Sequence, residues 1–462
     1  MRVLLVVYDN ESYIHWFPQG LGYIAAVLRR EGHEVVIYNQ DLHHYPDEHL
    51  TVYLDNNLFD VIGFSFIAGY YQYKKAIKIS NAINASKRRP YYIIGGHGPA
   101  PEPEYFLKKT NADSVVIGEG EITIVELLQA VKDKASLKNV KGIAYMDGGI
   151  VVINERRPLI ADIDSIPMPA YDLFPIEYYR LLRIPHATSS DFIMPLLSGR
   201  GCTFQCTFCY RMDKGFRPRS NEHIVEEIKF LIANYGITYI AFSDELLMSS
   251  IERVESLCEY FLKEKIAIKW DCNGRLNYAR PKILQLMKRA GCVFINYGIE
   301  AMDDKVLKNM KKSLTTKQII QGVEATLNAG ISPGYNIIFG NIGDNPETLN
   351  KGVEFLIKYD DGAQMRTIRP VTPYPGSPLY YTAIEHGLLK DCEDFYENKH
   401  INSDLVAINF TDMSDDQFHK CLFNANSKLL SNYSAQKLTK MLADSKSLYL
   451  EKNATFRGYR QA

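Results

Sequence analysis

The sequence has few of the features that mark membrane, exported or nucleic-acid-binding proteins. No apolar run reaches the ~18 residues of a membrane-spanning helix. The N-terminal segment Met1-Arg2-Val3-Leu4-Leu5-Val6-Val7 lacks the long apolar core and cleavage site of a signal peptide. The formal net charge is −1, from 53 basic and 54 acidic residues, so no basic excess indicates nucleic-acid binding. These absences predict a cytoplasmic protein with no transmembrane segment and no nucleic-acid partner.

Cysteine is absent from residues 1–201 and is scarce in most of the remaining chain. Eight cysteines in 462 residues do not make a disulfide scaffold. Three of them lie in one short segment, at positions 202, 206 and 209. We expect packed or free thiols at the other five, which are Cys258, Cys272, Cys292, Cys392 and Cys421. The length suggests about three domains, and 46% apolar residues are enough for a large core.

The three clustered cysteines have C-x3-C-x2-C spacing, and Gly199 and Gly201 precede them directly. This spacing could also place Cys202, Cys206 and Cys209 on one face of a helix as inert packed thiols. The two glycines argue against that reading because glycine is a poor helix former. A zinc site is the second alternative, but it would need a fourth ligand nearby. The spacing therefore favours an iron–sulfur cluster, because clusters are held by thiolates.

The segment resembles the cluster loop of the radical S-adenosylmethionine (SAM) enzymes, in which an aromatic residue precedes the last cysteine, as Phe208 does here. The resemblance implies that Cys202, Cys206 and Cys209 hold a [4Fe–4S] cluster. It also implies that the amino and carboxylate groups of SAM bind the fourth iron. One electron from the cluster would then cleave SAM to methionine and a 5′-deoxyadenosyl radical.

Residues 1–154 alternate between strand-like and helix-like patterns, which predicts a doubly wound, Rossmann-like parallel sheet. In such sheets ligands bind at the carboxyl ends of the strands. The predicted strands cover residues 3–8, 35–38, 61–66, 91–95 and 114–117, and the predicted helices cover residues 21–30, 71–84 and 122–132.

The loops at the predicted strand ends are rich in glycine, in the order Pro-Gln-Gly-Leu-Gly-Tyr from residue 18, a serine, a Gly-Gly pair and Gly-Glu-Gly-Glu from residue 118. In this order they resemble the cobalamin-binding domain that precedes the barrel in one radical SAM subfamily. The resemblance implies that cobalamin contacts Gln19, Gly20, Ser65, Gly95, Gly96, Gly118, Glu119 and Gly120. A domain of this fold that binds nothing is the alternative, because fold does not fix function.

The sequence departs from two related groups of proteins, and each departure limits what the resemblance implies. Other cobalamin domains carry Asp-x-His-x-x-Gly, and the nearest match here, residues 41–46, ends in proline and follows the second strand. The resemblance therefore implies a cobalt without a protein nitrogen ligand, and we expect His43, His44 and His97 to be polar loop residues. Because no cysteine precedes Cys202, the N-terminal domain cannot hold the second cluster of methylthio-transferring enzymes.

The second half of the chain begins after a predicted hairpin at residues 142–153 and a linker at 155–190 that contains five prolines. Residues 191–385 again alternate strand and helix, which predicts a partial, TIM-like (β/α)6 barrel. Residues 386–462 are predicted to be mainly helical, with helices at 415–431 and 435–450. The predicted barrel strands cover residues 192–197, 238–243, 266–272, 293–299, 332–339 and 364–368, and the helices between them cover 222–234, 251–265, 281–290, 316–328 and 347–359.

Polar residues follow the second, third and fourth predicted barrel strands. By their own pattern these residues could be helix caps, solvated turns or surface ion pairs. Arg275 has the planar fork that suits a carboxylate, and Glu300 is expected to be structural or to bind ribose. The resemblance implies that SAM contacts Phe208, Ser243, Asp244, Asn273, Arg275, Gly298 and Glu300.

Together these patterns predict a cobalamin-dependent radical SAM enzyme that methylates an unactivated carbon of a small molecule, lipid or peptide. The resemblance implies that the 5′-deoxyadenosyl radical takes hydrogen from the substrate and that methylcobalamin supplies the methyl group. An electron donor such as flavodoxin or ferredoxin is the expected partner. A cobalamin-dependent rearrangement or cyclisation without methyl transfer remains an alternative, as does a cobalamin-binding sensor or carrier.

Overall fold

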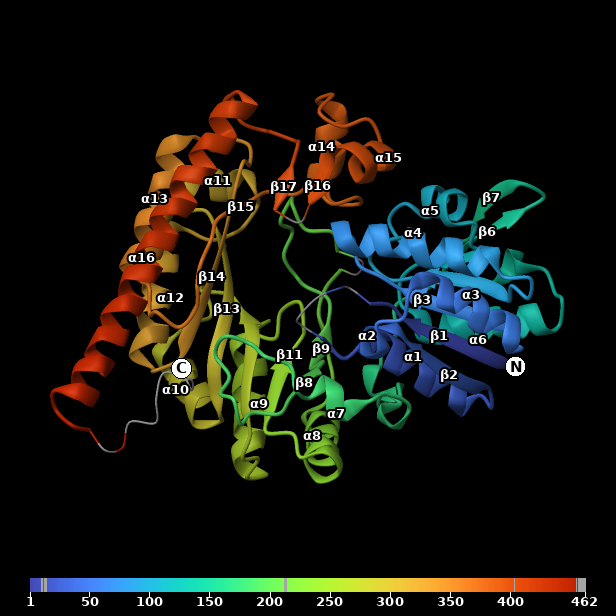
Figure 1. Cartoon of the computed structure of the whole chain (residues 1–462), viewed down its shortest axis with the longest axis horizontal. Coiled ribbons are helices and arrows are strands. Elements are labelled where there is room, and N and C mark those ends of the chain that lie inside the picture. Colours follow the sequence, from blue (N-terminus) through green and yellow to red (C-terminus); the bar gives the residue numbers. More distant parts are fainter. Residues whose placement is uncertain (10, 12–14, 212–213, 403, 454, 456–462) are drawn as a thin grey trace.

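The computed structural model describes residues 1–9, 11, 15–211, 214–402, 404–453 and 455. Two α/β units lie side by side, and a C-terminal segment reaches back from the second unit over the first (Figure 1). Among the described residues, no helix is both long enough and apolar enough to cross a membrane.

The N-terminal unit is a seven-stranded sheet with the order β2-β1-β3-β4-β5-β6-β7. The first five strands are parallel, and the predicted hairpin adds two antiparallel strands at one edge. The strands are β1 (Arg2–Val7), β2 (Glu34–Asn39), β3 (Val61–Ser65), β4 (Tyr91–Gly95), β5 (Ser114–Val116), β6 (Ile143–Asp147) and β7 (Ile150–Ile153).

Both faces of this sheet are buried, as the alternating direction of its side chains requires. On β1, Leu5 faces a core that includes helices α1 and α6, whereas Leu4 faces a second core that includes α3, α4 and α5. The prediction of a doubly wound sheet is therefore confirmed. The helices are α1 (Gln19–Arg30), α2 (Gln40–His43), α3 (Asp47–Asn56), α4 (Tyr70–Ala85), α5 (Pro103–Thr110) and α6 (Gly120–Lys132), followed by the 3-10 turn η1 (Leu137–Asn139).

The proline-rich segment between the two units is packed against both of them. Its side chains Tyr171, Phe174 and Tyr179 are buried, and their rings lie 5.1–5.9 Å from the ring of Phe17 in the first unit. The hydroxyl of Tyr171 donates to Glu227 of the second unit at 2.5 Å. The segment contains η2 (Ile163–Ser165), η3 (Tyr171–Leu173) and α7 (Ile176–Tyr179).

The second unit is a curved, wholly parallel sheet of six strands in the order β15-β14-β13-β12-β11-β8, which is the predicted partial barrel. A small hairpin of β9 (Gly199–Arg200) and β10 (Arg217–Pro218) stands beside its first strand. The barrel strands are β8 (Ile193–Leu196), β11 (Tyr239–Phe242), β12 (Lys269–Gly274), β13 (Cys292–Glu300), β14 (Ser332–Phe339) and β15 (Arg369–Pro370). The helices are α8 (Asn221–Tyr235), α9 (Ile251–Lys263), α10 (Pro281–Arg289), α11 (Asp304–Asn309), α12 (Thr316–Asn328) and α13 (Pro346–Lys358).

The last barrel strand differs from its prediction. Residues 364–368 were expected to form it, but the strand is the two-residue β15, which begins at Arg369. The preceding side chain of Arg366 is instead engaged by Asp360 and Asp361. The backbone N–H and oxygen of Ile368 bond the side-chain amide of Asn426 in the C-terminal helix, at 2.8 and 3.0 Å. Side-chain partners thus take the place of sheet pairing at these positions.

The C-terminal segment first crosses to the N-terminal unit and then returns to the barrel (Figure 1). Phe395 and Tyr396 pack with Ile79 and Phe106 in the core beneath α4 and α5, and α16 packs along α13. The segment consists of α14 (Pro378–Glu385), α15 (Cys392–Asp394), the π-helical turn η4 (Phe395–Lys399), β16 (His400–Asn402), β17 (Leu405–Val406) and α16 (Asp415–Tyr449).

The prediction of two helices at 415–431 and 435–450 is wrong, because α16 is one helix from Asp415 to Tyr449. The intervening Ser431-Asn432-Tyr433-Ser434 contains only weak helix formers, and neither proline nor glycine is present to end the helix. Asn432 instead donates its side-chain amide to Asp360 across the interface with the barrel, at 3.1 Å.

Candidate functional site

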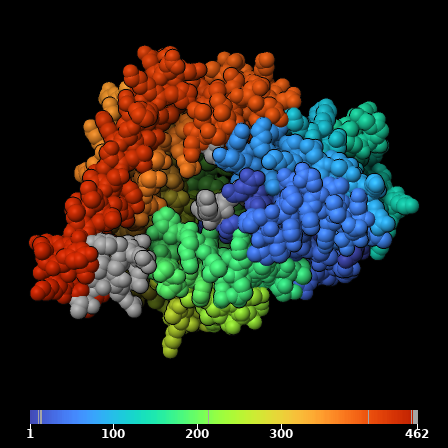
Figure 2. All heavy atoms as spheres, in the orientation of Figure 1, coloured from blue at the N-terminus to red at the C-terminus, as the bar shows by residue number. Residues whose placement is uncertain are grey.

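A cavity of about 720 Å³ lies at the carboxyl ends of the N-terminal strands and extends to the cysteine loop of the barrel. It sits where the strand order reverses between β1 and β3, which is the usual ligand site of such sheets. In the space-filling view, the molecule is hollowed where the first unit, the barrel and the C-terminal segment meet (Figure 2). All eight residues proposed to contact cobalamin line the cavity, namely Gln19, Gly20, Ser65, Gly95, Gly96, Gly118, Glu119 and Gly120.

The backbone of these loops leaves room for a bulky ligand. Gly118 has a φ of +89°, and a Cβ atom added to it or to Gly20 would meet nothing within 4 Å. The side-chain nitrogen Nε2 of Gln19 is buried and has no hydrogen-bond partner among the described residues. Its side-chain oxygen accepts a hydrogen bond from Ser243 of the barrel at 2.5 Å. A ligand with amide oxygens, as cobalamin has, fits this arrangement because it could accept from Nε2.

The two glutamates of the Gly-Glu-Gly-Glu loop connect the first unit to the cysteine loop. Arg200 lies 2.9 Å from Glu119 and 2.6 Å from Glu121, and Arg217 lies 3.0 Å from Glu119. Burial would raise the pKa of Glu119, but the hydrogen bonds from Arg217, Ile160 and Arg200 outweigh it and the pKa is lowered. The carboxylate of Glu119 is thus held by Arg200 and Arg217, and its contact with cobalamin stays a prediction.

The cysteine loop follows β8 and is held in place by Asp244 at the end of β11. The carboxylate of Asp244 accepts from the backbone N–H groups of Ser198 at 2.9 Å and Gly199 at 2.5 Å. Asp244 is fully buried, and this burial raises its pKa to about 6 against the opposing effect of those hydrogen bonds. Asp244 therefore positions the loop, and its contact with SAM stays a prediction.

The three cysteines differ in their electrostatic environment. A hydrogen bond with Cys209 is the main reason that the pKa of Cys206 is lowered to about 6, and the charges of Lys312 and Arg275 also lower it. The same hydrogen bond and burial raise the pKa of Cys209, and burial raises the pKa of Cys202. Thiolates are the form that binds iron, so a cationic neighbourhood fits a cluster.

No three Cys, His, Asp or Glu side chains converge as ligands of a single metal ion in the part of the chain that the structure describes. A four-iron cluster does not require such convergence, because each cysteine binds a different iron.

Four of the residues proposed to contact SAM gather around Cys206. Burial lowers the pKa of Arg275, and the thiols of Cys206 and Cys202 oppose this effect. Glu300 pairs with Lys312 at 2.9 Å, and the Lys312 nitrogen lies 5.8 Å from the ring centre of Phe208. Gly298 makes room for this pair, because a Cβ atom there would lie 2.3 Å from a carboxylate oxygen of Glu300. Glu300 has a φ of +70°, a conformation that costs energy in non-glycine residues and that is concentrated at functional sites.

Of the two remaining proposed SAM residues, Ser243 and Asn273, only Ser243 lines the cavity. Asn273 donates its amide to the backbone oxygen of Asp244 at 2.8 Å and accepts from Asn296 at 3.0 Å.

Sequence reasoning missed Glu245, which lines the cavity beside Ser243. Successive side chains of an extended segment point to opposite sides, so Ser243 and Glu245 share a direction that Asp244 does not. This alternation of side-chain direction along the sequence could have indicated Glu245 as a cavity residue. Lys312 and Arg200 were missed as well, because their partners are distant in the sequence.

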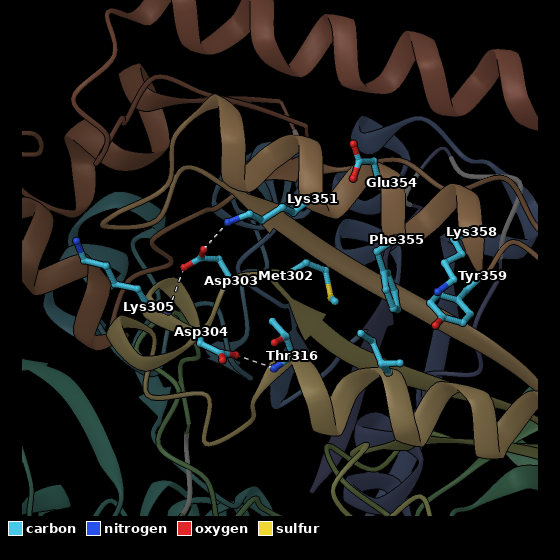
Figure 3. Close-up of a pocket in the computed structure, with 11 residues that line it drawn as sticks. Met302, Asp303, Asp304, Lys305, Thr316, Lys351, Glu354, Phe355, Lys358 and Tyr359 are labelled. Carbon is cyan, nitrogen blue, oxygen red and sulfur yellow. Dashed lines mark hydrogen bonds and ion pairs between the residues drawn. The ribbon is translucent and has the colours of Figure 1, made fainter.

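A second hollow, of about 650 Å³, lies on the outside of the barrel among α11, α12 and α13 (Figure 3). Lys351 forms an ion pair with Asp303 at its rim, at 3.1 Å. None of the proposed site residues lines it.

The fold and the site define a class of enzyme that uses two cofactor domains, one a doubly wound ligand-binding sheet and the other a parallel half barrel with a three-cysteine loop. The sequence model of the Radical SAM superfamily matches residues 196–356, and that of the B12 binding domain matches residues 6–128. The chain belongs to the family of radical SAM enzymes that carry an N-terminal B12-binding domain.

Individual proteins that are similar to this chain in sequence or fold support the family assignment. The chain is 30% identical to an uncharacterized methyltransferase of Pyrococcus horikoshii over 403 aligned residues. The alignment covers 84% of each sequence. It is 25% identical to the anaerobic magnesium-protoporphyrin IX monomethyl ester cyclase of Rubrivivax gelatinosus, over 79% of this chain and 66% of the cyclase. The fold is similar to the radical SAM methyltransferase TsrM from Kitasatospora setae, solved with cobalamin and a [4Fe–4S] cluster, with a TM-score of 0.74, 17% identity and coverage of 93% of this chain and 88% of TsrM.

The family fixes the cofactors as a [4Fe–4S] cluster, SAM and cobalamin. The glycine-lined cavity with the buried Gln19 amide fits cobalamin, and the loop with cationic neighbours at Cys206 fits the cluster.

Proposed function

We propose that this enzyme transfers a methyl group to an unactivated carbon of a small molecule, lipid or peptide. The observation that supports this proposal most is the shared cavity, because the proposed cobalamin loops and the start of the cysteine loop line the same space. When bound, the cluster, SAM and cobalamin supply the electron, the hydrogen-abstracting radical and the methyl group.

The residues of the chain would act by holding these groups close together. Cys202, Cys206 and Cys209 would hold the cluster, while Gln19 and the glycine loops would hold cobalamin. The ion pairs of Arg200 with Glu119 and Glu121 fix the two loops relative to each other, which is how positioning contributes to rate. Ser243 and Glu245 also line this cavity and are proposed to contact SAM or substrate.

A radical cyclisation or rearrangement without methyl transfer is the second candidate. The similarity to a protein named as a cyclase favours it. The sensor or carrier reading has less support, because a carrier would not need three cysteines with a lowered thiol pKa at Cys206.

We further propose a cytoplasmic location and a small redox protein, such as flavodoxin or ferredoxin, as electron donor. The cysteine-poor composition is consistent with a reducing compartment.

The decisive experiment uses full-length protein reconstituted without oxygen with iron, sulfide and cobalamin. It is incubated with SAM, a reductant and candidate substrates, and 5′-deoxyadenosine and S-adenosylhomocysteine are quantified. Substrate-dependent formation of both products is the expected result. Deoxyadenosine alone would support cyclisation or rearrangement instead, and the Cys206→Ala variant should form neither product.

A further inference from the structure

Arg275 is a buried cation whose charge is not balanced by a carboxylate. The residue is 5% exposed. Its Nη2 donates to the backbone oxygens of Lys312 and, at 3.5 Å, Ser313, and its Nε donates to the side chain of Asn277 at 3.3 Å. These acceptors are all neutral, and no Asp or Glu pairs with Arg275 among the residues that the structure describes. Because a buried charge without a counter-charge is costly, a negative group is expected beside it.

The groups beside Arg275 that become negative when they bind iron are the thiols of the cysteine loop. The thiols of Cys206 and Cys202 oppose the lowering of the Arg275 pKa by burial. The guanidinium carbon also lies 3.4 Å from the centre of the Phe204 ring, in the middle of the cysteine loop. The stack and the backbone acceptors fix the plane of the guanidinium, so its charge has a fixed position relative to the loop.

Lys312, the other buried cation near Cys206, differs in that it has an ionic partner. Its nitrogen lies 2.9 Å from Glu300, and both side chains are less than a tenth exposed. Glu300 therefore offsets part of the positive charge of Lys312. Arg275 is the buried cation here that has no carboxylate paired with it in the described part of the chain.

We infer that Arg275 is the fixed counter-charge of the cluster and favours its reduced state, in place of the contact with the SAM carboxylate that the sequence suggested. Reduction would add one electron to a group that three thiolates already make anionic, so a fixed cation beside the cysteine loop would stabilise the reduced form more than the oxidised form. The inference rests on the presence of the cluster and is independent of whether the enzyme transfers methyl groups.

The test is a potentiometric titration of the [4Fe–4S] cluster in full-length protein, followed by electron paramagnetic resonance, with dithionite as reductant and with neither SAM nor substrate. Arg275→Met removes the charge, and Arg275→Lys keeps it. Arg253→Met is the control, because Arg253 is half-buried and donates to the start of the loop at Ser198, at 3.1 Å, but the charge of Asp244 acts on it and opposes the lowering of its pKa by burial.

At the wild-type midpoint potential, we expect the ratio of reduced to oxidised cluster to fall about tenfold in Arg275→Met, which is 59 mV for a one-electron couple. Arg275→Lys and Arg253→Met should stay within about twofold of the wild type. Iron and sulfide content is measured for each variant, so that loss of the cluster is not mistaken for a shift in potential.

An unchanged midpoint in an Arg275→Met protein with full iron content would overturn the inference. If that variant cannot hold a cluster, Arg275→Gln and Arg275→Lys are compared, and equal midpoints for these two would overturn it as well. SAM affinity is measured in parallel. Weaker SAM binding at an unchanged potential would restore the carboxylate contact and refute the counter-charge.

Discussion

At the scale of single residues, neighbours in the sequence have different tasks because they point in different directions. Ser243 and Glu245 face the cavity, whereas Asp244 between them is buried against the start of the cysteine loop. The consequence is that substitutions of adjacent residues should separate loop positioning from ligand binding.

The ionisation of Asp244 should make stability depend on pH. Its pKa in the folded protein is about 6, above the ordinary value of 3.8, so the folded state binds the proton more tightly. The stabilisation of the folded state that comes from binding this proton is fully present below pH 3.8 and is lost as the pH rises through about 6. In Asp244→Asn, Oδ1 can still accept from both backbone N–H groups. The melting temperature of apo Asp244→Asn, relative to the wild type, should therefore rise between pH 4.5 and pH 7. A difference that does not change with pH would show that burial does not govern this carboxyl.

The three cysteines of the loop should be required for the cluster, and buried thiols elsewhere should not. Cys206→Ala removes a thiolate that no neighbouring ligand replaces, so the visible absorbance and the iron content of reconstituted protein should fall to background. Cys272→Ala is the control, because Cys272 is 1% exposed in the barrel wall and lies outside the loop. Retention of a four-iron cluster in Cys206→Ala would contradict the assignment.

At the scale of elements, ion pairs between side chains join a strand-end loop of the first unit to the β9–β10 hairpin of the second. Glu119 is 7% exposed at its side chain and is contacted by both Arg200 and Arg217. Sequence resemblance assigned Glu119 to cobalamin, but a resemblance cannot tell whether backbone or side chain makes a contact. That distinction depends on the two arginines, which are 81 and 98 residues away along the chain.

Glu119→Gln should weaken both the contact between the two units and the binding of cobalamin, because Glu119 forms ion pairs with Arg200 and Arg217. Arg200 and Arg217 would each lose one carboxylate partner, although Arg200 keeps its ion pair with Glu121. The change is worth about 1–3 kcal/mol and would lower cobalamin affinity by roughly 5- to 150-fold if the loop shifts. The measurement is equilibrium binding of hydroxocobalamin to protein without the cluster. Glu104→Gln is the control, because its ion pair with Lys108 is exposed and such pairs contribute about 0–1 kcal/mol. Equal cobalamin affinities for the two variants would contradict the prediction that the ion pairs of Glu119 support cobalamin binding.

At the scale of the whole molecule, the two units share one apolar core. Residues of the first sheet, the connecting segment and the barrel belong to the same buried cluster, which includes Leu5, Phe17, Tyr171 and Ile228. The connecting segment therefore does not act as a flexible tether, although its five prolines predicted a linker. Its boundaries at 155 and 190 stay a prediction.

Limited proteolysis should reveal this packing. Residues 155–190 of the wild type should resist proteases because Tyr171, Phe174 and Tyr179 are buried. Phe17→Ala removes the ring that contacts all three, at a cost of about 3–5 kcal/mol, and should expose the segment to cleavage. Leu58→Ala, at a position 68% exposed, should leave the cleavage pattern unchanged. Rapid cleavage of the wild type in this segment would contradict the shared core.

The sequence by itself determined the features that depend on short spacing along the chain. The C-x3-C-x2-C segment, the glycine loops after buried strands and the alternation of strand and helix are all local, so they predicted the family, the cofactors and both α/β units. Only the tertiary structure decided that Asp244 holds the loop, that Glu119 meets Arg200, that Arg275 stacks on Phe204 of the cysteine loop and that α16 is continuous. These outcomes depend on partners brought together from distant parts of the chain, and the energy of a buried charge or a helix interior is set by such partners more than by local preference.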